Sequence, residues 1–210
     1  MPVSRRVVLA GGISALALSA CTTISTGTTS SAYRTAYLRV PKSEKFTVAP
    51  VPVSRIPRQF HRQIVRDPTG KKPGTIVVDP SAKYLYLVQD GGKALRYGIG
   101  VGRQGFSWNG DAVIKRKAEW PNWYPPKAMQ KRDPEAAKWA SGMPGGPTNP
   151  LGARALYLYD GGRDTMYRIH GTNEPWSIGQ NVSSGCLRMM NQDVIELHSL
   201  VETGAKVIVH

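Results

Sequence analysis

From residue 73 to the C-terminus, short runs rich in Val, Ile, Tyr and Leu alternate with clusters of Gly, Pro and Asn. Alternating apolar and polar side chains over such short runs are typical of β-strands with one buried face. In LRYGIGVG, for example, one face is shared by Leu95, Tyr97, Ile99 and Val101. The sequence therefore predicts a mainly β fold with short helices, a sandwich or barrel of about 135 residues, which is enough for one hydrophobic core.

Two segments depart from this pattern and predict helices. The first, DPEAAKW over residues 133–139, has Asp133 as its expected N-cap and Pro134 at the first helical position. The second is QDVIELHSLV over residues 192–201, with Asn191 as its expected N-cap. Its apolar stripe consists of Val194, Leu197 and Val201.

The first 21 residues have the features of an export signal. Two arginines precede an uncharged run over residues 7–20, which is shorter than the ~20 apolar residues of a transmembrane helix, so we interpret residues 1–21 as a signal peptide. The run ends in Leu-Ser-Ala-Cys, which resembles the lipobox of bacterial lipoproteins, so Cys21 is the expected lipidation site. The alternative is an ordinary signal peptide that ends near a cysteine. The arginine pair also resembles a twin-arginine export signal.

Residues 22–72 are rich in Ser, Thr, Pro and basic side chains and contain few apolar ones. This composition favours a flexible tether between a lipid anchor and a domain over residues 73–210. An arm around His61 that packs against the domain is the alternative. The formal net charge of +14 favours anionic partners, which outside the cytoplasmic membrane are cell-wall polymer or anionic lipid. Export argues against nucleic acid as the partner.

Once Cys21 is acylated, Cys186 has no intramolecular partner for a disulfide. A thiol that persists in an oxidising compartment indicates that its chemistry is needed. His170 ends a β run sixteen residues earlier, and the Gly-, Pro- and Asn-containing loop 171–182 is suited to folding back. Because an imidazole can take the proton of a thiol, Cys186 is the candidate nucleophile and His170 its candidate base.

The residues around this cysteine fit an acyl-transfer site. Gly185 allows a backbone to approach a substrate carbonyl closely, and the N–H groups of Gly185 and Cys186, with Ser184, are suited to form an oxyanion hole. In an extended chain Arg188 lies on the same side as Cys186. Its guanidinium can bind a carboxylate bidentately, although a surface salt bridge is the alternative role.

The motif HGT at 170–172, followed by SSGCLRM at 183–189 and then Asn191, resembles the signature of the L,D-transpeptidase catalytic domain of the YkuD type. The segments TIVVDPSAKYLYLVQDGGKALRYGIGVG, WPNWYPP and NPLGARALYLY extend the resemblance over residues 74–210. The resemblance implies a β-rich fold, a cysteine acyl-enzyme and peptidoglycan stem peptides as substrate. We expect no metal and no cofactor, because the four histidines are scattered without a close pair and no Gly-rich phosphate loop precedes a helix pattern.

The resemblance also implies residue roles. Cys186 would be the nucleophile and His170 the base, with the backbone carbonyl of Gly171 orienting the imidazole. The substrate-binding residues would be Ser183, Arg188 and Asn191. Two departures stand out, because Ser184 replaces a histidine found in many members and GFSWNG at 105–110 replaces the usual Thr-Pro-containing loop.

The implied reaction is attack by Cys186 on the bond between diaminopimelate and the terminal D-alanine of a tetrapeptide stem. An amine then resolves the thioester and crosslinks two stems. A lipoprotein lysine or water as acceptor would instead give a lipoprotein-attaching enzyme or an L,D-carboxypeptidase. The non-enzymatic alternative is a lipid-anchored cell-wall-binding module, and a papain-like protease is disfavoured because there the cysteine precedes the histidine. We expect a monomer on the periplasmic face of a bacterial membrane.

Overall fold

The structure, a computed structural model, describes residues 43–51, 53–102, 109–183 and 185–210. The expected signal peptide with Cys21, the tether up to residue 42, most of the loop 105–110 and Ser184 lie outside the described residues. Within the four described ranges, no helix is long and apolar enough to cross a membrane.

One mixed sheet of nine strands dominates the described part of the chain. Its strands, in spatial order, are β1 (Gln63–Arg66), β4 (Lys93–Gly98), β3 (Tyr84–Gln89), β2 (Ile76–Asp79), β11 (Lys206–Val209), β6 (Gly110–Glu119), β7 (Arg154–Asp160), β8 (Arg163–His170) and β10 (Leu187–Arg188). The pairs β2–β11 and β8–β10 are parallel and the others antiparallel. A separate two-stranded sheet joins β5 (Val101–Gly102) and β9 (Asn181–Ser183). The prediction of a mainly β fold with short helices is confirmed.

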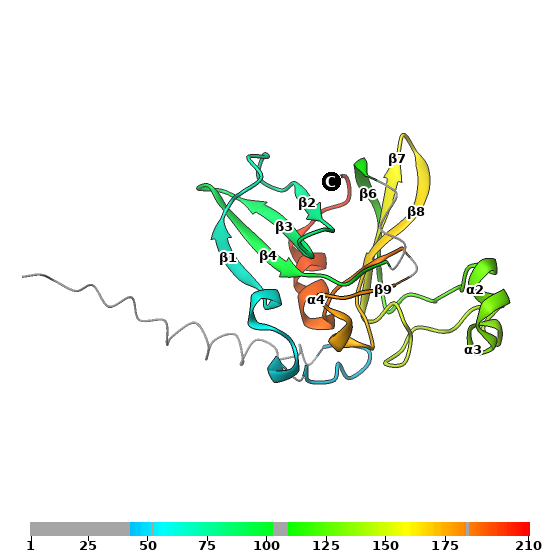
Figure 1. Cartoon of the computed structure of the whole chain (residues 1–210). Helices are drawn as coiled ribbons and strands as arrows, with labels where there is room; N and C mark the ends of the chain where they lie inside the picture. Colours follow the sequence, from blue (N-terminus) through cyan, green and yellow to red (C-terminus); the bar gives the residue numbers. More distant parts are fainter. Residues whose placement is uncertain (1–42, 52, 103–108, 184) are drawn as a thin grey trace, which may run out of the picture.

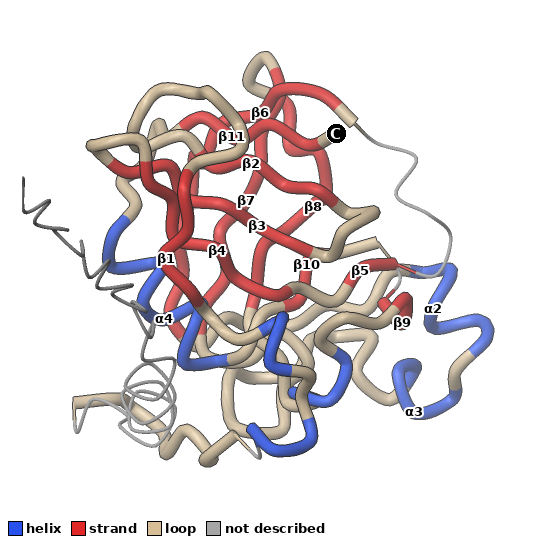
Figure 2. The backbone as a smooth tube through the Cα atoms, turned by 60° about the vertical axis from the view of Figure 1, so that its left-hand side comes forward, coloured by secondary structure: helices blue, strands red, loops and turns tan. Residues whose placement is uncertain are grey.

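The sheet bends around a single main core. One cluster of buried side chains runs from Leu95 in β4 to Leu187 in β10 and includes Val194 and Leu197 of the helix α4 (Asn191–Leu200). Figure 1 shows β1–β4 on one side and β6–β8 on the other, with α4 between them, and Figure 2 shows the same strands in red from another direction. The predicted buried face is confirmed, because this cluster contains Leu95, Tyr97, Ile99 and Val101.

The helices agree with the sequence in part. Asp133 caps α3 (Pro134–Ala137), since its carboxylate accepts hydrogen bonds from the backbone N–H groups of Glu135, at 3.0 Å, and Ala136, at 3.3 Å. The preceding helix α2 (Lys127–Arg132) was not predicted. In Figure 1 both helices project from the side of the sheet.

The predicted N-cap of α4 is wrong. Met190 occupies the N-cap position without a side-chain cap, and Asn191 is the first helical residue. The side-chain amide of Asn191 is engaged elsewhere, in the site described below.

Residues 43–72 do not form the tether predicted for residues 22–72; the alternative, a packed arm, is what the structure shows. Strand β1 pairs with β4 along its whole length. Before it, residues 43–62, the N-terminal arm, contain the 3-10 helices η1 (Val53–Arg55) and η2 (Arg58–Phe60). A second cluster of buried residues unites this arm with the domain and consists of Val51, Ile56, Phe60, Ile178 and Met190.

The start of the arm is held by a buried ion pair. Oε1 of Glu44 lies 2.5 Å from Nη2 of Arg154 in β7, and both side chains are only 7% exposed. The indole N–H of Trp120 also donates to Glu44, at 2.9 Å, and the ring of Phe46 packs edge-on against Trp120. Four apolar residues of the arm are buried, namely Val48, Val51, Ile56 and Phe60, which composition alone does not reveal.

Candidate active site

The candidate base ends β8, and the candidate nucleophile directly precedes the neighbouring strand β10. In the parallel pairing of β10 with β8, Leu187 is opposite Ile169 and Arg188 is opposite His170. Leu187 and Ile169 are fully buried in the core. Because side chains alternate along a strand, His170 and Arg188 project from the other face of the sheet, as does Cys186, two residues before Arg188.

The register brings Cys186 close to His170. Cys186 precedes β10 by one residue, at the level of Arg168, and its thiol makes a hydrogen bond with the backbone of Arg168. Two strand residues span about 6.6 Å and neighbouring strands lie about 4.8 Å apart, so the Cα atoms of Cys186 and His170 are roughly 8 Å apart. Side chains on one face can meet across that distance.

The imidazole of His170 is buried and oriented. Its Nδ1 lies 2.5 Å from the carbonyl oxygen of Gly171, and because a carbonyl only accepts, Nδ1 carries the proton and Nε2 is the basic nitrogen. Burial lowers the pKa of His170 to about 4; the charges of Arg188 and Arg168 act in the same direction, against the backbone hydrogen bonds with Gly171 and Leu151. At neutral pH the imidazole is therefore an uncharged proton acceptor.

The thiol of Cys186 is half-buried beside two cations. Burial raises the pKa of the Cys186 thiol above its ordinary value, although the charges of Arg168 and Arg188 and the backbone of Arg168 counteract this effect. The resting site is thus a protonated thiol beside a neutral imidazole.

The backbone before the nucleophile has a special conformation. Gly185 has a φ of +126°, which L side chains rarely adopt, so a glycine is required to aim the N–H groups of this turn. Only the backbone of Ser183 is described, at the end of β9, and Ser184 is not described. The oxyanion hole of Gly185 and Cys186 remains a prediction.

Arg188 is fixed through its backbone and paired through its side chain. Its N–H donates to the carbonyl of Gly100 at 2.8 Å, and its own carbonyl accepts from Gly100 at 2.9 Å. The guanidinium Nη1 donates to Glu174 Oε2 at 2.7 Å. The salt bridge considered as an alternative role is present, but it uses only part of the guanidinium.

Asn191 ties the segment after His170 to the start of β7. Its Oδ1 accepts from the N–H of Ala153 at 2.9 Å, and its Nδ2 donates to the carbonyl of Thr172 at 3.0 Å. The amide fills space that a Cβ on Gly171 or Gly152 would occupy. These contacts support a positioning role for Asn191 rather than direct binding of substrate.

Sequence reasoning missed Arg168, which shares the face of His170. Two guanidinium nitrogens of Arg168 bind the two carboxylate oxygens of Asp164, at 2.7 and 2.8 Å, and the guanidinium stacks 4.5 Å from the ring centre of Tyr157. Arg168 lies two residues before His170 in the same β run, so the alternation of side chains along a strand could have predicted that the two share a face. Sequence reasoning also missed Glu174, which has no such periodic signal.

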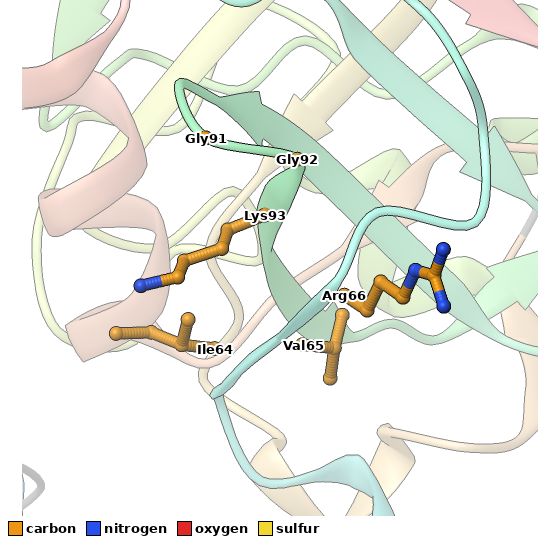
Figure 3. A pocket seen from close by; sticks show the side chains of 6 residues that line it. All are labelled: Ile64, Val65, Arg66, Gly91, Gly92 and Lys93. Atoms are coloured by element: carbon orange, nitrogen blue, oxygen red, sulfur yellow. The ribbon is translucent and has the colours of Figure 1, made fainter.

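One hollow of the described surface lies away from this site. It has a volume of about 560 Å³ and is formed at β1 and the β3–β4 turn (Figure 3). Because β1 and β10 are opposite edges of the sheet, it does not belong to the cysteine site. Its lining consists of Ile64, Val65, Arg66, Gly91, Gly92 and Lys93.

Comparison with known families identifies the same region. Residues 73–209 match the model of the L,D-transpeptidase catalytic domain, YkuD. A probable L,D-transpeptidase, ErfK/SrfK of Escherichia coli K12, is 32% identical over 149 residues, which are 70% of this chain and 46% of that protein. The probable L,D-transpeptidase YbiS of the same strain is 35% identical over 138 residues, or 63% of this chain and 43% of that protein. The chain thus spans less than half of the length of these relatives.

A solved structure is more similar in sequence. A crystal structure from Brucella melitensis, described as a probable carnitine operon oxidoreductase (caia), is 51% identical, with a TM-score of 0.51. The match covers 74% of this chain and 96% of that one. It therefore includes more of this chain than the family domain does.

Proposed function

Because the chain belongs to the L,D-transpeptidase catalytic domain family, we propose that it is an acyltransferase that acts on peptidoglycan stem peptides. The observation that carries the proposal is the arrangement of His170, whose Nδ1 is tied to Gly171 and which shares a face with Cys186. The oxidoreductase activity belongs to the description of the Brucella melitensis protein alone and is not assigned to this chain. Here a neutral base beside a thiol supports acyl transfer.

The first half-reaction forms a thioester. The Cys186 proton passes to Nε2 of His170 while sulfur attacks the carbonyl between the third residue of the stem and its terminal D-alanine. The N–H groups of Gly185 and Cys186 stabilise the oxyanion, a contribution of roughly 3 kcal/mol per donor in related chemistry. The C–N bond then breaks, and D-alanine leaves with the proton that His170 returns.

The second half-reaction resolves the thioester. His170, neutral again, takes a proton from an incoming amine, which attacks the acyl carbon; the C–S bond breaks, and His170 returns the proton to the sulfur of Cys186. If the amine belongs to the third residue of another stem, the product is a crosslink. A lipoprotein lysine or water as acceptor leads to the two alternative activities.

We also propose that the enzyme is exported and works as a monomer on the periplasmic side of a membrane. The support is in the sequence, where the Leu-Ser-Ala-Cys motif resembles a lipobox and makes Cys21 the expected lipidation site. The segment between Cys21 and the N-terminal arm would then give the domain its reach to the cell wall.

Mass spectrometry of products tests the proposal. The full-length chain is incubated with purified disaccharide-tetrapeptide, beside the variants Cys186→Ala and His170→Gln. Loss of D-alanine together with a Cys186-dependent dimer establishes the crosslinking transpeptidase, whereas loss of D-alanine alone identifies a carboxypeptidase. If a demonstrably reduced enzyme yields neither an acyl-enzyme nor a product, the cell-wall-binding module is the better interpretation.

A further inference from the structure

The loop that joins the candidate base to the candidate nucleophile is anchored on the N-terminal arm. Among residues 171–181, Ile178 is the one buried apolar side chain, 1% exposed. The buried cluster to which it belongs draws most of its members from the arm and consists of Val51, Ile56, Phe60, Ile178 and Met190. The apolar support of this loop therefore comes mainly from outside the family domain, which begins at residue 73.

Phe60 fills the space between two glycines. A Cβ on Gly98, at the end of β4, would overlap the Cβ and the backbone of Phe60, and a Cβ on Gly179 would overlap its ring. The ring also packs against Tyr84, with 5.7 Å between the ring centres. Phe60 thus contacts the backbone of the loop and the end of β4 at the same time.

The loop backbone at this contact is hydrogen-bonded to the segment that also holds β10. The N–H of Gly179 donates to the carbonyl of Ile99 at 3.0 Å. The next residue, Gly100, exchanges two hydrogen bonds with Arg188 of β10, and Arg188 follows Cys186 by two residues. A displacement of the loop at Gly179 would therefore reach the strand that begins beside the thiol.

Met190 connects the same cluster to the base. It directly follows Met189, whose N–H donates to the carbonyl of His170 at 2.8 Å. It directly precedes Asn191, whose Nδ2 donates to the carbonyl of Thr172 at 3.0 Å. The cluster thus supports both segments that flank the candidate nucleophile, the loop before it and the start of α4 after it.

Polar contacts fix the arm on α4. Nε2 of Gln192 donates to the carbonyl of Ala49 at 3.0 Å, and Arg62, at the end of the arm, forms an ion pair with Glu196. Figure 1 shows the arm, in blue to cyan, beside α4. The arm is therefore held independently of the loop that it supports.

We propose that the N-terminal arm is part of the catalytic unit and that Phe60 is a positioning residue, which acts through loop 171–182 and Met190 on His170 and Cys186. A displacement of about 1 Å at reacting groups can cost about a hundredfold in rate, so a loop without its apolar anchor should impair turnover. The effect on turnover rests on the proposed function, whereas the effect on the loop does not.

Hydrogen exchange in the full-length chain tests the support of the loop without turnover. In Phe60→Ala the amide of Gly179 should exchange at least about tenfold faster than in the wild type, because the loop can then open locally. Leu87→Ala is the matched control, since Leu87 is buried in β3 in the main core and truncations of both kinds create a cavity. It should speed exchange at Val88, whose N–H donates to the carbonyl of Thr75, and leave Gly179 within about twofold.

Release of D-alanine from the tetrapeptide gives the second readout. Phe60→Ala should lower kcat about tenfold or more and leave KM within about twofold, because misplaced catalytic groups slow the reaction of bound substrate. Phe60→Leu retains most of the apolar volume, so it should recover much of the loop protection and of kcat. Ile56→Ala, in the same cluster, should act in the same direction as Phe60→Ala, so the test does not depend on the folding of one variant.

The outcomes separate this inference from the proposed function. If Phe60→Ala and Leu87→Ala speed the exchange of Gly179 equally, or if neither does, the positioning role is overturned. Faster exchange at Gly179 in Phe60→Ala alone, with no D-alanine release by the wild type, supports the arm as the anchor of the loop and contradicts the transpeptidase. Release of D-alanine that both variants lower equally supports the transpeptidase and overturns the positioning role of Phe60.

Discussion

Arg188 lies directly opposite His170 in the parallel pairing of β10 with β8, so a permanent cation stands beside the imidazole of the proposed base. Burial, reinforced by this charge, lowers the pKa of His170 to about 4, and burial raises the pKa of the Cys186 thiol. The site therefore differs from cysteine enzymes whose thiolate is already paired with an imidazolium.

The first prediction concerns the reactivity of Cys186. Alkylation by iodoacetamide reports the thiolate fraction, so its rate should rise steadily toward alkaline pH without a plateau near neutral pH. His170→Gln should change the neutral-pH rate only within about a factor of two to three, since the resting thiol does not depend on an imidazolium. A neutral-pH plateau that disappears in His170→Gln would show that the resting site is an ion pair.

The second prediction concerns Arg168, whose charge lowers the pKa of the Cys186 thiol against the effect of burial. Arg168→Met should raise that pKa further and slow alkylation near neutral pH several-fold. Arg163→Met is the control, because Arg163 lies exposed at the start of the same strand.

Asp164→Asn sharpens this test, because it removes the carboxylate that offsets the Arg168 charge. It should speed alkylation, the opposite of Arg168→Met. Equal rates in the wild type and Arg168→Met, with an intact fold, would contradict an electrostatic role for Arg168.

The third prediction concerns the packing of Gly171. A Cβ at this position would overlap Oδ1 of Asn191, so Gly171→Ala should displace the amide and its bonds to Ala153 and Thr172. Overpacking of this kind costs about 1–3 kcal/mol of unfolding free energy, measurable by urea denaturation. Turnover should fall as well, because the Gly171 carbonyl orients His170.

A second substitution tests whether the overlap is the cause. Asn191→Ala alone should destabilise the protein, but in the Gly171→Ala background it should cost much less, since the clash is then removed. Such non-additivity is expected for residues in contact. If the two substitutions change the unfolding free energy additively, the destabilisation by Gly171→Ala does not come from the overlap with Asn191.

The sequence predicts the sheet well because strand signals are local. Alternating apolar residues recur every second position, so the burial of Leu95, Tyr97, Ile99 and Val101 follows from their spacing. The cap of α3 by Asp133 is equally local. The pairing of His170 with the segment of Cys186 is a long-range feature, and only the chemistry of a thiol and an imidazole pointed to it.

Three features could not be predicted because they depend on tertiary partners. The N-terminal arm has too few apolar residues to form a periodic pattern, yet Phe60 and its neighbours fill a gap beside Ile178. Asn191 is a good N-cap residue by type, but its amide satisfies backbone groups of Ala153 and Thr172 instead. Glu174 becomes significant only because its loop carries it to Arg188.

The fourth prediction concerns the buried pair between Glu44 of the arm and Arg154. Burial raises the pKa of Glu44, but hydrogen bonds from Arg154 and Trp120 outweigh it, so the net pKa lies below the ordinary value. The pair therefore stabilises the fold above the unfolded-state pKa of Glu44, and this contribution is lost as pH falls through the lower folded-state pKa. Glu44→Gln should cost about 3–5 kcal/mol in urea unfolding at neutral pH, because it leaves Arg154 buried without its partner.

Glu119→Gln is the matched control for Glu44→Gln, since Glu119 lies 3.7 Å from the same guanidinium but is 66% exposed. Its loss should change the unfolding free energy by about 1 kcal/mol or less. Turnover should also fall in Glu44→Gln, because the carbonyl of Arg154 accepts the N–H of Gly171, whose own carbonyl orients His170. If Glu44→Gln lowers the unfolding free energy as little as Glu119→Gln does, the arm is bound by its apolar contacts alone. The ion pair of Glu44 then has no part in positioning His170.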